Sequence, residues 1–236
     1  MTSKRKSNIA LPILGALALA GLGVSAAVEA QQVNKMTFFL TSSGSGKGAD
    51  LGGIAGADAH CANLAKAAGS TRTNWRAYLS VTPTKDKDGK DVPGVNARDR
   101  IGKGPWTNIK GQVVARNVAD FQNPANKLNA RTALTEKGDQ IPGRAEATAK
   151  TADNKHDVLT GSDPAGMYST AGGDTTCGNW TKSGEGSAIV GHHDREGLNP
   201  QRHMTSAISS HGSRGCSQDN LKASGGAGLF YCFAAN

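Results

Sequence analysis

The sequence predicts an α+β fold with few helices, short strands and long loops. One stretch of the chain has the three- and four-residue spacing of an amphipathic helix, whereas the other apolar runs are short and suit strands. The chain also contains 31 glycines, which interrupt regular structure and favour turns. No internal repeat is visible, so we expect a single domain over residues 31–236.

The N-terminal part of this domain predicts a strand, a helix and a second strand. Residues 36–41 (MTFFLT) form a short apolar run that is typical of a strand. After a loop rich in glycine and serine, apolar residues recur at helical spacing from Ile54 to Ala68. This helix places Cys61 on its buried face and ends at Gly69, and residues 75–81 (WRAYLSV) predict the next strand.

The middle of the chain has weaker patterns. Residues 84–94 are charged and rich in turn formers, and residues 122–155 predict a long loop excursion on the surface. Further short strands are expected at residues 112–115, 158–159 and 188–190, and a terminal strand at residues 229–233 (LFYCF).

The first 30 residues have the pattern of a signal peptide. Basic residues 4–6 precede an uncharged apolar run over residues 9–24, and small residues follow. This order predicts cleavage after Ala27 or Ala30, with a secreted or periplasmic mature chain and no membrane anchor after cleavage. A retained transmembrane anchor is the alternative, but the run is short and rich in glycine.

The charge of the chain is positive but scattered. The full sequence has 27 basic and 19 acidic residues, and its net charge is +8. The basic residues form no run with interleaved aromatic residues, so we expect no nucleic-acid partner. Weak binding of an acidic polysaccharide is compatible with this charge. The sequence leaves the oligomeric state open.

Four cysteines are present, and an exported chain with an even number of cysteines is expected to form disulfides. The cysteines are Cys61, Cys177, Cys216 and Cys232. They allow three pairings, and none of their spacings is typical of a zinc knuckle.

The densest group of ionisable residues is the run His192-His193-Asp194-Arg195. Imidazole and carboxylate groups are zinc ligands, and Asp174, His203 or His211 could join one of these histidines through folding. Neighbouring side chains on a strand point to opposite faces, however, so His192 and His193 are not expected to share one ion. The alternative is that one histidine packs in the interior while the Asp194–Arg195 pair organises a loop.

Other catalytic patterns are absent from the sequence. There is no GxSxG nucleophile elbow, and the loop SGSGKGAD at residues 43–50 lacks the hydroxyl residue that a phosphate-binding loop needs after its lysine. We therefore expect no catalytic residue and no cofactor. Trp106 and Trp180 both lie among glycine and polar residues. An exposed tryptophan there would stack on a sugar ring, and core packing is the alternative that we favour for Trp180.

Several segments, in their order and spacing, resemble a known family. The segments are the helix with Cys61, then residues 75–80 (WRAYLS), 161–166 (GSDPAG), 176–180 (TCGNW), 215–217 (GCS) and 229–232 (LFYC). They resemble endostatin-type domains, which are a variant of the C-type lectin-like fold. The chain also resembles bacterial exported proteins labelled lectin-like, which carry GADxHC, TCGNWT, GHHDR and GGAGLFYCFA segments.

The resemblance implies a fold of short, mostly antiparallel strands and two nested disulfides, Cys61–Cys232 and Cys177–Cys216. It does not carry over a calcium site, because the EPN or QPD tripeptide and the later WND of calcium-dependent lectins are absent. It does not carry over the zinc site of endostatin either, because that site uses N-terminal histidines and the mature chain has none before His60.

Two classes of function follow from these observations. The first is a non-enzymatic binding domain for carbohydrate that works without calcium. Its candidate residues are Asp174, His192, His193, Asp194, Arg195 and His211, with Trp106 for stacking. The second is a metal-binding protein or metal-dependent enzyme that uses His192, Asp194 and His211. A structural or adhesive envelope protein is a third possibility.

Overall fold

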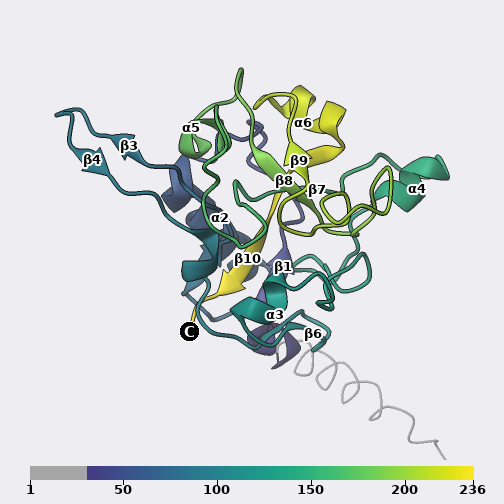
Figure 1. Ribbon diagram of the computed structural model, residues 1–236. Helices are drawn as coiled ribbons and strands as arrows, with labels where there is room; N and C mark the ends of the chain where they lie inside the picture. The colour runs from purple at the N-terminus through teal and green to yellow at the C-terminus, as the bar shows by residue number, and fades with distance from the viewer. Residues whose placement is uncertain (1–30) are drawn as a thin grey trace, which may run out of the picture.

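The computed structural model describes residues 31–236, and the predicted signal peptide lies outside the described residues. The fold is mixed α+β, with one long helix, several short ones and mostly short strands (Figure 1). The strands are β1 (Phe38–Leu40), β2 (Trp75–Ala77), β3 (Thr84–Lys85), β4 (Asp91–Val92), β5 (Trp106–Thr107), β6 (Val113–Ala115), β7 (Asp157–Leu159), β8 (Ile189–His192), β9 (His211–Gly212) and β10 (Gly226–Ala234). The helices are α2 (Gly53–Ala67), α3 (Val118–Gln122), α4 (Arg144–Thr148), α5 (Cys177–Trp180) and α6 (Gln218–Ser224), with a 3-10 turn η1 (Ala97–Asp99).

The main sheet is built around β10, which runs through the centre of the molecule (Figure 1). Strands β1 and β2 pair antiparallel with the C-terminal half of β10, on its two edges. Strand β7 pairs parallel with the N-terminal half of β10, on the same edge as β2. Strands β8 and β9 then extend the sheet in antiparallel order from β7. The expectation of short, mostly antiparallel strands is therefore confirmed, with β10–β7 as the parallel exception.

Helix α2 begins and ends within one residue of the boundaries that its sequence pattern predicts. Ala57, Cys61 and Ala65 repeat every four residues and are its buried face. The helix ends in a Schellman motif, in which the Gly69 amide donates to the Lys66 carbonyl and the Ser70 amide donates to the Ala65 carbonyl. Gly69 has φ +92°, a conformation that a residue without Cβ adopts at no steric cost. The buried face consists of small residues, so the helix can lie close to the sheet.

Aromatic side chains fill the core at the C-terminal end of β10. The Phe233 ring lies 5.1 Å from the Phe38 ring, 5.0 Å from the Trp106 ring and 5.0 Å from the Phe121 ring, measured between centroids. All three contacts are edge-to-face, the arrangement that aromatic quadrupoles favour. All four rings are fully buried. Segments far apart in sequence therefore meet on one residue of the central strand.

Both disulfides implied by the family resemblance are present. Cys61–Cys232 joins α2 to β10, and Cys177–Cys216 lies inside it in the sequence and joins α5 to the loop before α6. No cysteine in the described part of the chain is free. The loop-rich region before α6 is therefore tied covalently to the start of α5.

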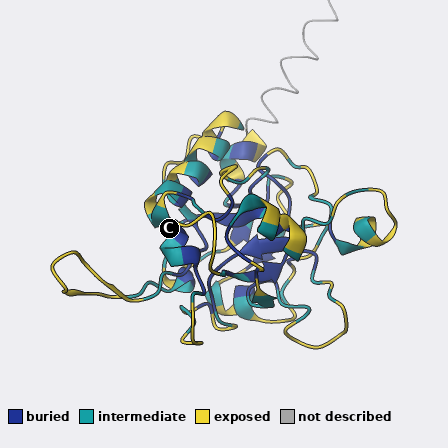
Figure 2. Cartoon of the chain, turned by 90° about the horizontal axis from the view of Figure 1, so that it is seen from above, coloured by how far each residue is buried: buried dark blue, intermediate teal, exposed yellow. Residues whose placement is uncertain are grey.

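The two loop segments differ in part from their sequence-based expectation. Residues 84–92 form a β3–β4 hairpin, which projects from the body of the molecule and is exposed (Figures 1 and 2). The excursion over residues 122–155 lacks strands and includes the exposed helix α4. Its middle is not on the surface, however, because residues 133–136 are buried and Thr135 bridges to Leu40 of β1.

Within residues 31–236, no helix has both the length and the hydrophobicity needed to cross a bilayer.

Removing either disulfide is expected to destabilise the fold, and the outer bridge is expected to matter more. The bridges close loops of 171 and 39 residues. Chain entropy alone then gives losses of about 5 kcal/mol for Cys61→Ala with Cys232→Ala, and about 4 kcal/mol for Cys177→Ala with Cys216→Ala. Denaturant unfolding of the two double variants measures this difference. Equal midpoints for wild type and the outer-bridge variant would contradict the expectation.

Candidate metal site

Strand register brings three polar side chains to one face of the sheet. Asp157 of β7 is directly opposite His192 of β8, and side chains of directly opposed residues point to the same face. His211 of β9 is opposite Val190, which is two residues from His192 and therefore on that same face. His156 immediately precedes β7. The site consists of His156, Asp157, His192 and His211.

The histidine rings converge on one carboxylate oxygen. Oδ1 of Asp157 lies 3.2 Å from Nε2 of His156, 3.3 Å from Nε2 of His192 and 3.6 Å from Nε2 of His211. The Nε2 atoms of His192 and His211 are 3.0 Å apart. These four spacings are close to the distance between ligands of tetrahedral zinc, which is about 3.3 Å when the bonds are about 2.0–2.1 Å long. The ligand atoms of His156, Asp157 and His192 all lie within 4.8 Å of one another.

The outer nitrogen of each ring faces an oxygen atom. Nδ1 of His156 lies 3.2 Å from both carboxylate oxygens of Asp194. Nδ1 of His192 lies 2.8 Å from the Met204 carbonyl oxygen, and Nδ1 of His211 lies 3.1 Å from the Gly212 carbonyl oxygen. A carbonyl or carboxylate oxygen accepts, so Nδ1 is assigned as the donor in each ring. A neutral imidazole then directs the lone pair of Nε2 toward Asp157, as metal-ligating histidines do.

This arrangement concentrates lone pairs around one buried carboxylate. Both carboxylate oxygens of Asp157 are buried and accept no hydrogen bond from the described residues. A buried carboxylate without a hydrogen bond is costly unless a cation is next to it. Burial acts against a charged His192, but contact with Asp157 and its negative charge raise the pKa of His192 above the usual value. The site therefore favours a positive charge, either a proton on His192 or a metal ion.

Access to the site is from the side of His211. The side chain of His211 is 32% exposed, whereas those of His156 and His192 are 5% and 2% exposed. The His156 and His192 rings are stacked, with centroids 4.0 Å apart and an interplanar angle of 13°. Coordination by both rings would therefore require one of them to turn toward the ion. His211, at the surface, has the most freedom to adjust.

His193 and Asp194 lie outside this group of ligands. His193 is fully buried, neither ring nitrogen has a hydrogen-bond partner among the described residues, and burial lowers its pKa to about 4. This fits the interpretation in which one histidine packs in the interior. Burial opposes ionisation of Asp194, but hydrogen bonds from His156, Arg144 and Glu196 lower its pKa to about 2. Asp194 thus contacts the Nδ1 side of the His156 ring, whereas the Nε2 side faces Asp157.

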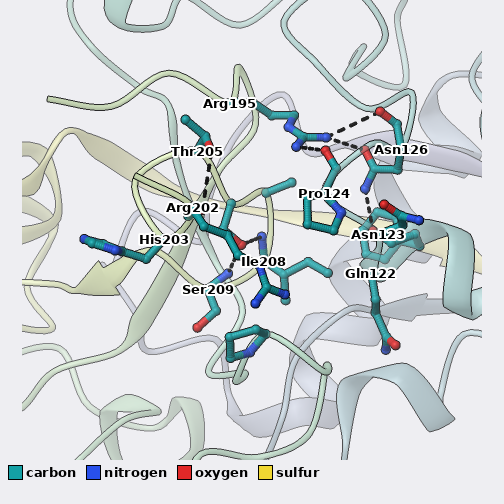
Figure 3. Close-up of a pocket in the computed structure, with 14 residues that line it drawn as sticks. Gln122, Asn123, Pro124, Asn126, Arg195, Arg202, His203, Thr205, Ile208 and Ser209 are labelled. Atoms are coloured by element: carbon teal, nitrogen blue, oxygen red, sulfur yellow. Dashed lines mark hydrogen bonds between the residues drawn. The ribbon is translucent and has the colours of Figure 1, made fainter. Parts of the chain in front are cut away.

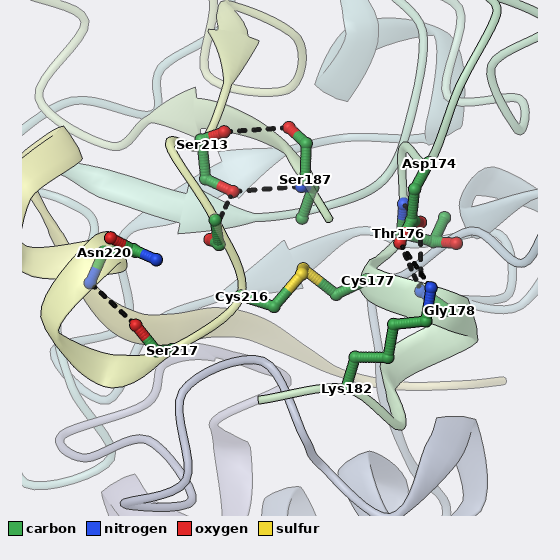
Figure 4. Close-up of a disulfide and its surroundings, with 12 residues drawn as sticks. Asp174, Thr176, Cys177, Gly178, Lys182, Ser187, Ser213, Cys216, Ser217 and Asn220 are labelled. Carbon is green, nitrogen blue, oxygen red and sulfur yellow. Dashed lines mark hydrogen bonds and ion pairs between the residues drawn. A yellow bond between two sulfur atoms is a disulfide. The ribbon is translucent and has the colours of Figure 1, made fainter. Parts of the chain in front are cut away.

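The remaining sequence-predicted residues are dispersed. Asp174 accepts hydrogen bonds from the backbone amides of Thr176 and Gly178, beside the Cys177–Cys216 disulfide (Figure 4). The guanidinium of Arg195 donates to oxygens of Pro124 and Asn126 in a separate cavity (Figure 3). Neither Asp174 nor Arg195 therefore joins the group formed by His156, Asp157, His192 and His211.

The prediction that Trp106 stacks on a sugar was wrong, because its side chain is fully buried against Phe233. Trp180 is also fully buried, and its Nε1 donates to the Ser80 carbonyl oxygen at 2.8 Å, which confirms the core interpretation for this residue.

Sequence reasoning missed His156 and Asp157. They directly precede the apolar pair Val158-Leu159, which was predicted as a strand. A His-Asp pair at the start of a short strand is the signal that could have found them, but only the pairing of β7 with β8 shows that they meet His192. No protein-family model matches the chain, and no curated protein is detectably similar to it.

Metal-free protein is expected to lose stability as the pH falls from about 6.5 to 4. His193 has a pKa of about 4 in the folded state, below its usual value of 6.5, so the unfolded chain binds more protons in this range. Its stabilising contribution is present above pH 6.5 and lost as the pH falls through the folded-state pKa, by about 3 kcal/mol in total. Urea unfolding at several pH values measures this.

The variant His193→Leu is the matched comparison. Neither ring nitrogen of His193 has a partner, so leucine leaves no described hydrogen-bonding group unpaired. The variant should show a shallower dependence of the unfolding free energy on pH between 6.5 and 4. An unchanged dependence would mean that other groups cause the acid sensitivity.

Proposed function

We propose that this chain is an exported, non-enzymatic domain that binds one divalent transition-metal ion, with zinc as the best match. The ligands are His156, Asp157 and His192, whose ligand atoms all lie within 4.8 Å of one another, with His211 beside Asp157 and His192 as the fourth. The observation that carries the proposal is the convergence of three Nε2 atoms on one buried carboxylate oxygen, with each Nδ1 facing an oxygen on its outer side. Nitrogen-rich ligand sets of this kind suit zinc, copper and nickel, whereas calcium and magnesium prefer oxygen.

A stabilising role for the ion fits this ligand set better than a catalytic one. Four protein ligands leave no open position on a tetrahedral zinc ion, and catalytic zinc sites keep one position for water or substrate. The ion would join β7, β8 and β9 at the end of the main sheet that is formed by β9. Its binding free energy would then contribute to folding of this region.

The proposal also covers the fold of the domain and the cellular location of the chain. The mixed α+β fold, the helix α2 and the two nested disulfides are compatible with a C-type lectin-like domain, and we propose that assignment for the fold. The disulfides also support an extracytoplasmic location, because such bonds persist in oxidising compartments. Carbohydrate binding is not retained as the leading proposal, because its candidate residues do not share one surface.

Metal binding is tested with the full mature chain after chelation and dialysis. Titration with Zn²⁺ should show one site per chain and should raise the thermal midpoint, because an ion that binds the folded state stabilises it. Co²⁺ in the same site should give a visible absorption band of the intensity typical of tetrahedral coordination. Absence of Zn²⁺ binding by correctly oxidised wild-type protein would overturn the proposal.

The variant His211→Gln gives the sharpest test because His211 is the most exposed ligand, so its replacement should leave the fold intact. Loss of outer-sphere partners alone costs about 10- to 100-fold in metal affinity, and loss of a direct ligand should cost at least about 100-fold. His60→Gln is the matched control, since His60 contacts the Ser43 carbonyl oxygen outside the site. Equal Zn²⁺ affinity of the two variants would exclude His211 as a ligand.

A further inference from the structure

A cavity lies beside Arg195, and none of the proposed metal ligands lines it. Its volume is about 260 Å³, near the lower end of the range for small-molecule sites, which begins at ~300 Å³. Residues from the 122–126 segment and from the loop over residues 202–209 line it, together with Phe121, Pro164 and Arg195 (Figure 3). The proposed metal site does not account for this cavity.

The cavity has an apolar interior and a polar rim. Phe121, Ala207 and Ile208 are at most 5% exposed and form apolar parts of the wall. Pro124 and Pro164 add apolar surface nearer the opening, where both residues are exposed. Buried apolar walls favour an apolar molecule, because contact with them removes its surface from water.

The ionisable side chains that line the cavity are all basic. Arg195, Arg202 and His203 line it, and no aspartate or glutamate does. Neither arginine has a carboxylate within 4.0 Å among the described residues, although the chain forms such pairs elsewhere, as in Arg100–Asp58 at 2.7 Å. A low-dielectric wall next to unbalanced positive charge attracts anions.

The guanidinium of Arg195 is held by hydrogen bonds, and some of its N–H donors are unused. Its guanidinium donates to the Pro124 carbonyl oxygen and to two oxygens of Asn126, all neutral acceptors (Figure 3). These contacts use at most three of its five N–H donors. Its backbone has φ +60°, an uncommon conformation for a residue with a side chain, and such conformations cluster at functional sites.

We propose that this cavity binds a small organic carboxylate with a compact apolar body. The apolar body would pack against Phe121 and Ile208, and the carboxylate would pair with Arg202 and the free donors of Arg195. One carboxylate matches this site better than a phosphate ester, because the walls are largely apolar. The proposal stands apart from metal binding, since no metal ligand lines the cavity.

The test uses benzoate, phenylacetate and hexanoate, each beside its neutral amide, with the full mature chain. Ligand-observed NMR and calorimetry should show binding of at least one carboxylate and weaker binding of its amide. Arg202 is exposed, so Arg202→Gln should fold normally. It should weaken carboxylate binding by about three- to tenfold and leave amide binding unchanged, because the ion pair is partly solvated. Arg131→Gln, at an exposed position outside the cavity, is the matched control.

A second variant tests the location. Ser209→Phe places a ring in the cavity and should abolish binding of both the carboxylate and the amide. The proposal is overturned if no probe binds, if amides bind as tightly as carboxylates, or if Ser209→Phe binds like wild type. Repeating the titration after chelation separates this result from the metal site: carboxylate binding should persist even if the chain binds no zinc.

Discussion

Pairing of β10 with three other strands is the constraint on which the rest of the structure depends. Its nine residues are almost all buried, and its two halves serve different parts of the fold. The C-terminal half holds β1 and β2 and carries Phe233 and Cys232, around which the aromatic core and α2 are assembled. The N-terminal half holds β7, which in turn positions β8 and β9. The aromatic core and the strands of the candidate metal site are therefore both positioned by β10.

The geometry of the candidate metal site depends mainly on the register between β7 and β8. Side chains alternate along a strand, so a slip of one residue between β7 and β8 would turn Asp157 and His192 to opposite faces. The bonds that fix this register come from short strands, and the loop carbonyl of Met204 orients His192 from outside the sheet. The same loop then continues to Ile208 in the wall of the carboxylate cavity. Two separate sites therefore border one loop.

The sequence predicted local elements better than it predicted the site. Helical spacing identified α2 and its buried Cys61, and apolar runs identified β1, β2 and β10, because these signals are local. The β3–β4 hairpin was missed, because its strands are two residues long and exposed. His192 and His211 were found as candidates, but Asp157 was not, since these two partners lie 35 and 54 residues away from it in sequence. Trp106 was misjudged, because polar neighbours in sequence do not reveal tertiary burial.

The Cys61–Cys232 bond makes most of the chain a covalent ring. The exposed hairpin at residues 84–92 and the exposed loop around α4 both lie within this ring, and such loops are where proteases cut first. A single nick in either loop would open the ring without releasing a fragment, and the two pieces would separate only under reducing conditions. Strands β8 and β9 lie within a second ring closed by Cys177–Cys216. The strands that carry His192 and His211 would thus stay covalently attached to each other after proteolytic cleavage outside residues 177–216.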